Sequence, residues 1–147
     1  MFKHILVPTD GSELSQDTVK RALSFAREAN ARVSFVCAER HYPTMYLGMG
    51  AISDSHAARQ FHDAEESVAQ AILAQCKALA DDAGVASDSL AIVSDEPYEA
   101  IILAAERQQC DLIFMASHGR RGLKALLLGS ETQKVLTHST IPVLVYR

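Results

Sequence analysis

Hydrophobic positions along the chain alternate between short apolar runs and longer stretches with helical spacing. Short runs rich in branched residues predict buried strands, because a strand covered on both faces has no solvent-facing positions. These runs lie at residues 5–7, 33–38, 90–93, 112–116 and 143–146. Between them, apolar residues recur every three or four positions, which predicts helices. The helical stretches span residues 12–30, 57–84, 97–106 and a short segment that starts at residue 130.

Residues with special backbone preferences mark the ends of these helices. Ser12 is the predicted N-cap of the first helix, and Asn30 closes it. Pro97 suits the first turn of the third helix, and residues 130–133 (SETQ) predict a capping box for the last one. Residues 39–56 show no clear period and predict a long loop. In the second helix, the spacing predicts a shared apolar face made of Phe61, Val68, Ile72, Cys76 and Leu79.

The order of these elements predicts the fold. Strands that alternate with helices form a parallel sheet through right-handed crossovers, with helices on both faces. We therefore expect an α/β fold: a Rossmann-like sandwich of five parallel strands with helices on both faces, formed by a single domain of residues 1–147. The last strand, residues 143–146, is predicted to lie at a sheet edge, where an exposed apolar strand invites pairing with another chain.

Composition and charge exclude several classes of function. The net charge of −4 argues against a nucleic-acid binder, which is usually basic, and no apolar run approaches the ~18 residues of a membrane span. The cysteines at 37, 76 and 110 are far apart, which is typical of reduced thiols in a cytoplasmic protein. His62 and Glu66 have i, i+4 spacing but lack a convincing third ligand, so we predict no metal site.

Candidate chemistry gathers after the fourth predicted strand. In a doubly wound sheet, ligands bind beyond the carboxyl ends of the strands, where the strand order reverses. Gly119 and Gly129 allow backbone amides to approach an anion closely. The pair Gly129–Ser130 stands at a helix start, where free N–H groups and the helix dipole favour negative charge. This segment therefore suits a phosphate group.

Two further features near the strand ends are open to two interpretations each. Arg120, Arg121 and Lys124 form a basic island on an acidic chain, which favours an anion, but the same residues with Gly122 fit a solvated turn. The carboxylate of Asp10 is suited to accept hydrogen bonds from a base or a ribose, or to form an Asx-turn that starts the helix. The glycine spacing matches neither a dinucleotide fingerprint nor a P-loop.

Three segments together resemble the universal stress protein family of the UspA type. Residues 7–12 (VPTDGS) resemble the opening of that family. Residues 116–119 (ASHG), nine residues and then 129–130 (GS) resemble its nucleotide signature, although Ala116 stands where the signature has its first glycine. The closing segment 141–145 (IPVLV) is also similar. The resemblance covers the whole chain.

The resemblance implies a fold of the adenine nucleotide alpha hydrolase type and membership of the ATP-binding branch. The implied ligand is ATP, ADP or AMP, alone or with Mg²⁺, used as a regulatory signal in the stress response with at most slow hydrolysis. Asp10 would contact adenine, with Pro8 and Thr9 beside the ribose and Ala38 along the base. Gly119, Gly129 and Ser130 would hold the phosphates. The full set of predicted binding residues is Pro8, Thr9, Asp10, Ala38, Met115, Ala116, His118, Gly119, Arg120, Arg121, Gly122, Gly129, Ser130, Glu131 and Thr132.

The same resemblance leaves an alternative and implies a partner. Ala116 is tolerated if it only lines the pocket, but it is strained if the backbone there needs a positive φ. In the second case, the chain is a dimeric interaction module that binds no nucleotide. In either case the resemblance implies a homodimer joined through strand 143–146. A third class, an adenylyl-transferring enzyme, lacks its S-G-G-x-D-S and H-x-G-H motifs here.

Overall fold

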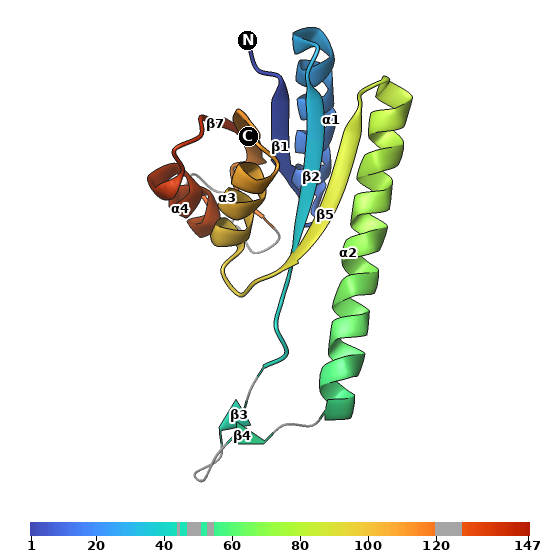
Figure 1. Cartoon of the computed structure of the whole chain (residues 1–147), viewed down its shortest axis with the longest axis vertical. Helices are drawn as coiled ribbons and strands as arrows, with labels where there is room; N and C mark the ends of the chain where they lie inside the picture. Colours follow the sequence, from blue (N-terminus) through green and yellow to red (C-terminus); the bar gives the residue numbers. More distant parts are fainter. Residues whose placement is uncertain (44, 47–50, 53–54, 120–127) are drawn as a thin grey trace.

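The computed structural model describes residues 1–43, 45–46, 51–52, 55–119 and 128–147 (Figure 1). Its main sheet holds five parallel strands in the order β5-β2-β1-β6-β7. They are β1 (His4–Pro8), β2 (Arg32–Glu39), β5 (Ser87–Val93), β6 (Leu112–Ala116) and β7 (Val143–Tyr146). The helices are α1 (Glu13–Ala29), α2 (Ser55–Ala83), α3 (Pro97–Arg107) and α4 (Ser130–His138). The predicted α/β fold with five parallel strands is confirmed.

The main departures from the predicted elements lie beside β2 and at β5. Within the expected loop 39–56, β3 (Met45–Tyr46) and β4 (Ala51–Ile52) form a short antiparallel pair, and α2 already begins at Ser55. Strand β5 starts three residues earlier than predicted, at Ser87. It is an edge strand whose first residues are polar and largely exposed, so the apolar pattern covers only its second half.

The helix ends confirm three of the four capping predictions. The Ser12 side chain accepts a hydrogen bond from the backbone N–H three residues on at 3.3 Å, and Asn30 adopts the left-handed conformation with φ 52°. Pro97 occupies the first turn of α3. The capping box is wrong, because Gly129 holds the N-cap position of α4 without a side-chain hydrogen bond and Ser130 is already helical.

Helices cover both faces of the sheet, as predicted (Figure 1). Alternate strand residues point to opposite faces, so Val7 and Phe35 pack with α1 and α2, whereas Leu6 and Ile113 pack with α3 and α4. Each of these four side chains is completely buried. The continuous apolar runs in the sequence reflect this double burial, because both faces of the central strands are covered.

The buried face of α2 matches the predicted one in part. Its fully buried residues are Ala69, Leu73, Cys76 and Ala80. The predicted Ile72 and Leu79 are partly buried against the same core, whereas Val68 is 52% exposed. Small residues at 69, 76 and 80 let the helix approach the sheet closely, so the contact line runs one position away from Val68. The N-terminal half of α2 extends beyond the end of the sheet (Figure 1).

The strand order reverses between β1 and β6 at the centre of the sheet. From β1 the chain continues to α1 on one face, and from β6 it continues to α4 on the other. The two connections therefore diverge and leave a crevice at the carboxyl ends of these strands. In the part of the chain that the structure describes, no helix combines the length and apolar character needed to span a membrane.

Candidate functional site

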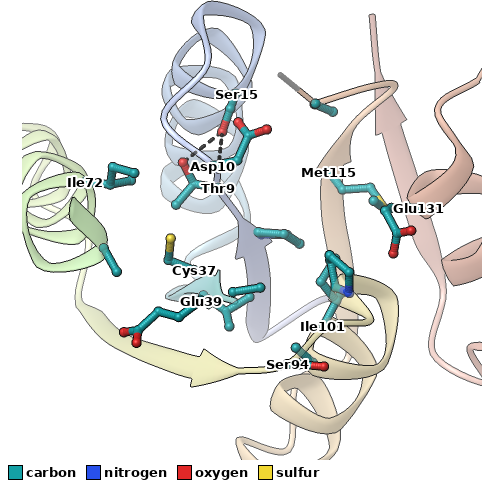
Figure 2. Close-up of a pocket in the computed structure, with 18 of the residues that line it drawn as sticks. Thr9, Asp10, Ser15, Cys37, Glu39, Ile72, Ser94, Ile101, Met115 and Glu131 are labelled. Carbon is teal, nitrogen blue, oxygen red and sulfur yellow. Dashed lines mark hydrogen bonds between the residues drawn. The ribbon is translucent and has the colours of Figure 1, made fainter. Parts of the chain in front are cut away.

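A cavity of about 810 Å³ lies at the crevice formed by the carboxyl ends of the strands (Figure 2). This volume falls in the range of small-molecule sites, ~300–1,000 Å³. All the predicted binding residues within the described ranges line it: Pro8, Thr9, Asp10, Ala38, Met115, Ala116, His118, Gly119, Gly129, Ser130, Glu131 and Thr132. Arg120, Arg121 and Gly122, like Lys124, lie outside the described residues.

The loop after β1 is held by short polar side chains. The Ser15 hydroxyl donates to Thr9 Oγ1 at 2.8 Å and accepts a bond from the Asp10 backbone N–H at 3.3 Å (Figure 2). Thr9 also forms a hydrogen bond with the Cys76 thiol. The pKa of this thiol is raised, because the effect of burial exceeds the opposite effect of the hydrogen bond. These contacts fix the loop against α1 and α2, so the polar groups at the end of β1 have defined positions.

Asp10 joins the loops that follow β1 and β6. Its Oδ1 accepts a hydrogen bond from the Ser12 backbone N–H at 2.9 Å, which is the Asx-turn that the sequence suggested. Its Oδ2 faces Gly119, where an added Cβ would lie only 2.6 Å from that oxygen. The absence of a side chain at position 119 therefore lets the Asp10 carboxylate stand against the second loop.

Gly129 brings the start of α4 against the end of β6. Its N–H donates to the Ser117 carbonyl at 2.7 Å, and an added Cβ would lie 3.1 Å from the Cα of His118. The first amides of α4 thus border the cavity, where helix N-termini favour anions. His118 itself forms a contact within the loop, with Nδ1 3.2 Å from the Ser117 hydroxyl.

Ala116 fits its position without backbone strain. Among the described residues other than glycine, positive φ values occur at Asn30 and Gln109, so Ala116 has a φ that alanine readily adopts. Its carbonyl accepts a hydrogen bond from the Thr132 hydroxyl at 3.1 Å, which ties β6 to α4. The strained alternative for this position is therefore wrong, and Ala116 lines the cavity.

The Glu131 carboxylate connects α4 to α3. Its Oε2 accepts a hydrogen bond from the Tyr98 backbone N–H at 2.8 Å, at the start of α3. Its Oε1 lies 3.4 Å from the Lys134 ammonium, which also contacts Glu96 at 2.9 Å. Glu131 is one of the predicted binding residues, and the structure gives its carboxylate a capping role between two helices.

Sequence analysis missed the wall of the cavity that α2 and the end of β2 form. Val68 and Ile72 of α2 line it, which accounts for the exposure of Val68. Glu39, the last residue of β2, also lines it and is only 7% exposed. Burial raises the pKa of its carboxyl group most, and the negative charges of Glu66 and Glu65 raise it further. A charged residue that directly ends an apolar strand was the available sequence signal.

An ion pair and a histidine–carboxylate contact fix the chain where it leaves β2 at the rim of the cavity. The Arg40 guanidinium contacts Glu65 of α2 at 2.7 Å, and the Arg40 backbone N–H donates to the same carboxylate at 3.1 Å. His41 Nδ1 lies 3.0 Å from Asp95, which follows β5. Within the described ranges, His, Cys, Asp and Glu side chains do not form a cluster of three or more that could hold a metal.

Comparisons with known proteins agree with this architecture. A universal stress protein from Thermus aquaticus, named for its place in the QAH/OAS sulfhydrylase 3' region, is 33% identical over 147 residues and covers all of both chains. The solved structure of the hypothetical protein MJ0577 superimposes with a TM-score of 0.82 at 27% identity, covering 99% of this chain and 95% of that one. A universal stress protein in complex with cAMP shares the fold, with a TM-score of 0.71 at 23% identity over 99% and 97% of the two chains.

The family model described as "Universal stress protein family" matches residues 1–147. The match includes the loops after β1 and β6 that border the cavity. This chain is therefore a member of the universal stress protein family.

Proposed function

We propose that this chain, as a single domain of residues 1–147, binds an adenine nucleotide in the cavity at the carboxyl ends of β1, β2 and β6. The observation that carries the proposal is the close approach of the two glycine positions to their neighbours. A side chain at 119 would displace Asp10, and one at 129 would press on His118. This cradle borders the first amides of α4, and such an arrangement of backbone donors suits phosphate.

Relatives of the same fold support this ligand class. One universal stress protein was solved in complex with cAMP, and another, from Archaeoglobus fulgidus, in complex with dAMP. Both ligands combine an adenine base with a single phosphate. We infer that ATP, ADP or AMP occupies the cavity here. Any Mg²⁺ would be bound to the phosphates of the nucleotide.

The bound nucleotide would act as a regulatory signal in the stress response with at most slow turnover. Two of the carboxylates that line the cavity, those of Asp10 and Glu131, each accept a hydrogen bond from a backbone N–H. Such bonds hold each carboxylate in a structural role. Fast hydrolysis requires a base aligned with the attacking water, and neither carboxylate is placed for that task.

Calorimetric titration of the nucleotide-stripped protein with Mg-ATP, ADP, AMP and cAMP tests the proposal. We expect saturable binding at micromolar affinity, and the ranking of the four ligands will measure the contribution of each phosphate. Absence of heat with all four ligands, together with an unchanged melting temperature, would contradict nucleotide binding. That result would favour the alternative of a dimeric interaction module that binds no nucleotide.

We further propose a cytoplasmic homodimer joined through β7. This strand pairs with β6 and forms an edge of the sheet, and its four residues are only partly buried. An apolar edge of this kind is stabilised by antiparallel pairing with a second copy. Light scattering at micromolar concentration should give twice the 16.0 kDa chain mass, and the mass of a single chain would contradict the dimer.

A further inference from the structure

The Glu39 side chain lies largely buried at the cavity, and within the described ranges no hydrogen bond holds its carboxylate. Glu39 is the last residue of β2, is 7% exposed and lines the cavity. Its backbone carbonyl accepts a bond from the Ser94 N–H at 2.8 Å, so the backbone at this position is satisfied. The side chain extends from β2 toward α2 (Figure 2). It therefore reaches the part of the cavity between the sheet and α2.

The surroundings of Glu39 disfavour its charge. Burial raises the pKa of its carboxyl group, the charges of Glu66 and Glu65 on α2 raise it further, and His62 lowers it to a smaller extent. The neighbouring cation, Arg40, contacts Glu65 through its guanidinium at 2.7 Å. A carboxyl group in such surroundings gains little from water or from neighbouring cations. A ligand group that donates a hydrogen bond would compensate for this.

The wall beside Glu39 suits a flat aromatic base. Val68, Ala69 and Ile72 present an apolar surface of α2 to the cavity, and nucleotide bases pack well against such surfaces. The opposite part of the cavity, at Gly119 and Gly129, is the cradle assigned above to phosphate. A nucleotide with its phosphates in that cradle has its base directed toward the β2 and α2 side.

We propose that Glu39 is a specificity-determining residue that accepts a hydrogen bond from the exocyclic amino group of the bound base. The inference rests on the proposed nucleotide function and identifies a side chain that recognises the base through a hydrogen bond. An amino group at the 6-position donates to the carboxyl oxygen, whereas the 6-carbonyl of hypoxanthine is an acceptor and cannot donate to Glu39. A site built for a donor rejects an analogue that lacks it. Glu39 thus selects adenine over hypoxanthine.

The matched nucleotides ATP and ITP test this assignment, because their bases differ at the 6-position, amino in one and carbonyl in the other. Calorimetry with the full chain should give the wild type a preference for ATP of about tenfold to a hundredfold, the range expected for one hydrogen bond to a charged group. Glu39→Leu should remove most of this preference by weakening ATP binding. Glu39→Gln should remove it differently, by strengthening ITP binding, since a carboxamide both accepts and donates.

A control variant separates the effect of negative charge near the cavity from the effect of the Glu39 hydrogen bond to the base. Glu66→Gln removes a neighbouring negative charge from an exposed position of α2 that does not line the cavity, and it should leave the ATP-to-ITP ratio unchanged. Melting curves establish whether each variant folds. If Glu39→Leu does not fold, the ATP-to-ITP ratio of Glu39→Gln tests the role of Glu39. A ratio that stays at the wild-type value in the folded Glu39 variants would overturn the inference.

The two proposals fail in distinguishable ways. A wild type that binds ATP and ITP equally would overturn the role of Glu39 and leave nucleotide binding in place. A wild type that binds neither nucleotide would overturn the proposed function, and the role of Glu39 with it.

Discussion

Replacing Gly129 with valine is expected to weaken adenine nucleotide binding by about tenfold to a hundredfold, the range that overpacking of 1–3 kcal/mol gives. The first added carbon would lie 3.1 Å from the His118 Cα and 3.3 Å from its Cβ. Because one of these atoms belongs to the backbone, relief requires movement of the loop after β6 or of the α4 N-terminus. Either movement displaces the amides that border the cavity. Calorimetric titration with ATP measures the effect.

A graded series makes this prediction sharper. Gly129→Ala places one carbon at the same 3.1 Å contact and should cause a smaller loss than valine. Ala78→Val adds a branched side chain on the exposed surface of α2, away from the cavity, and should bind ATP as the wild type does. Equal affinity in the wild type and the folded Gly129→Val variant would show that phosphate does not bind at this helix start.

Replacing Phe35 with alanine is expected to lower the free energy of unfolding by about 3–5 kcal/mol. Phe35 is completely buried and is the largest fully buried side chain in the part of the chain that the structure describes. It lies on β2 within the cluster that joins the sheet to α1 and α2. A loss of this size removes a large part of the ~5–15 kcal/mol that stabilises an ordinary domain. Urea unfolding followed by circular dichroism measures the change.

Phe61→Ala is the matched control for this prediction. Phe61 is partly buried and contacts Tyr42 at the outer end of α2, with ring centroids 5.7 Å apart. Because less apolar surface returns to water, its truncation should cost less than half as much as that of Phe35. Equal losses in the two variants would contradict the central position of Phe35 in the core.

The alternation of apolar runs and helical spacing was sufficient to predict the fold class. A strand covered on both faces carries an uninterrupted apolar run, and β1 and β6 satisfy this condition. The prediction was weaker at the edge strand β5, where exposed polar residues open the strand. It also missed β3 and β4, because two-residue strands leave no periodic signal.

Local spacing predicted the cavity residues that follow β1 and β6. Parallel strands bring their carboxyl ends to the same edge of the sheet, so polar and glycine residues after the strands were expected to meet there. The wall from α2 could not be predicted in this way. The rotation of a long helix about its axis depends on which side chains pack most closely against the sheet, and small residues decided it. This rotation turned Val68 toward the cavity.

The sequence alone determined the order of strands and helices, the parallel sheet and the glycines of the two loops, because these follow from short-range periodicity and backbone preference. Tertiary structure decided which groups face one another across the cavity. It placed the Asp10 carboxylate against Gly119, directed Glu131 to the start of α3 and left Glu39 buried beside α2. These contacts join residues distant in the chain, and their geometry is set only when the helices pack on the sheet.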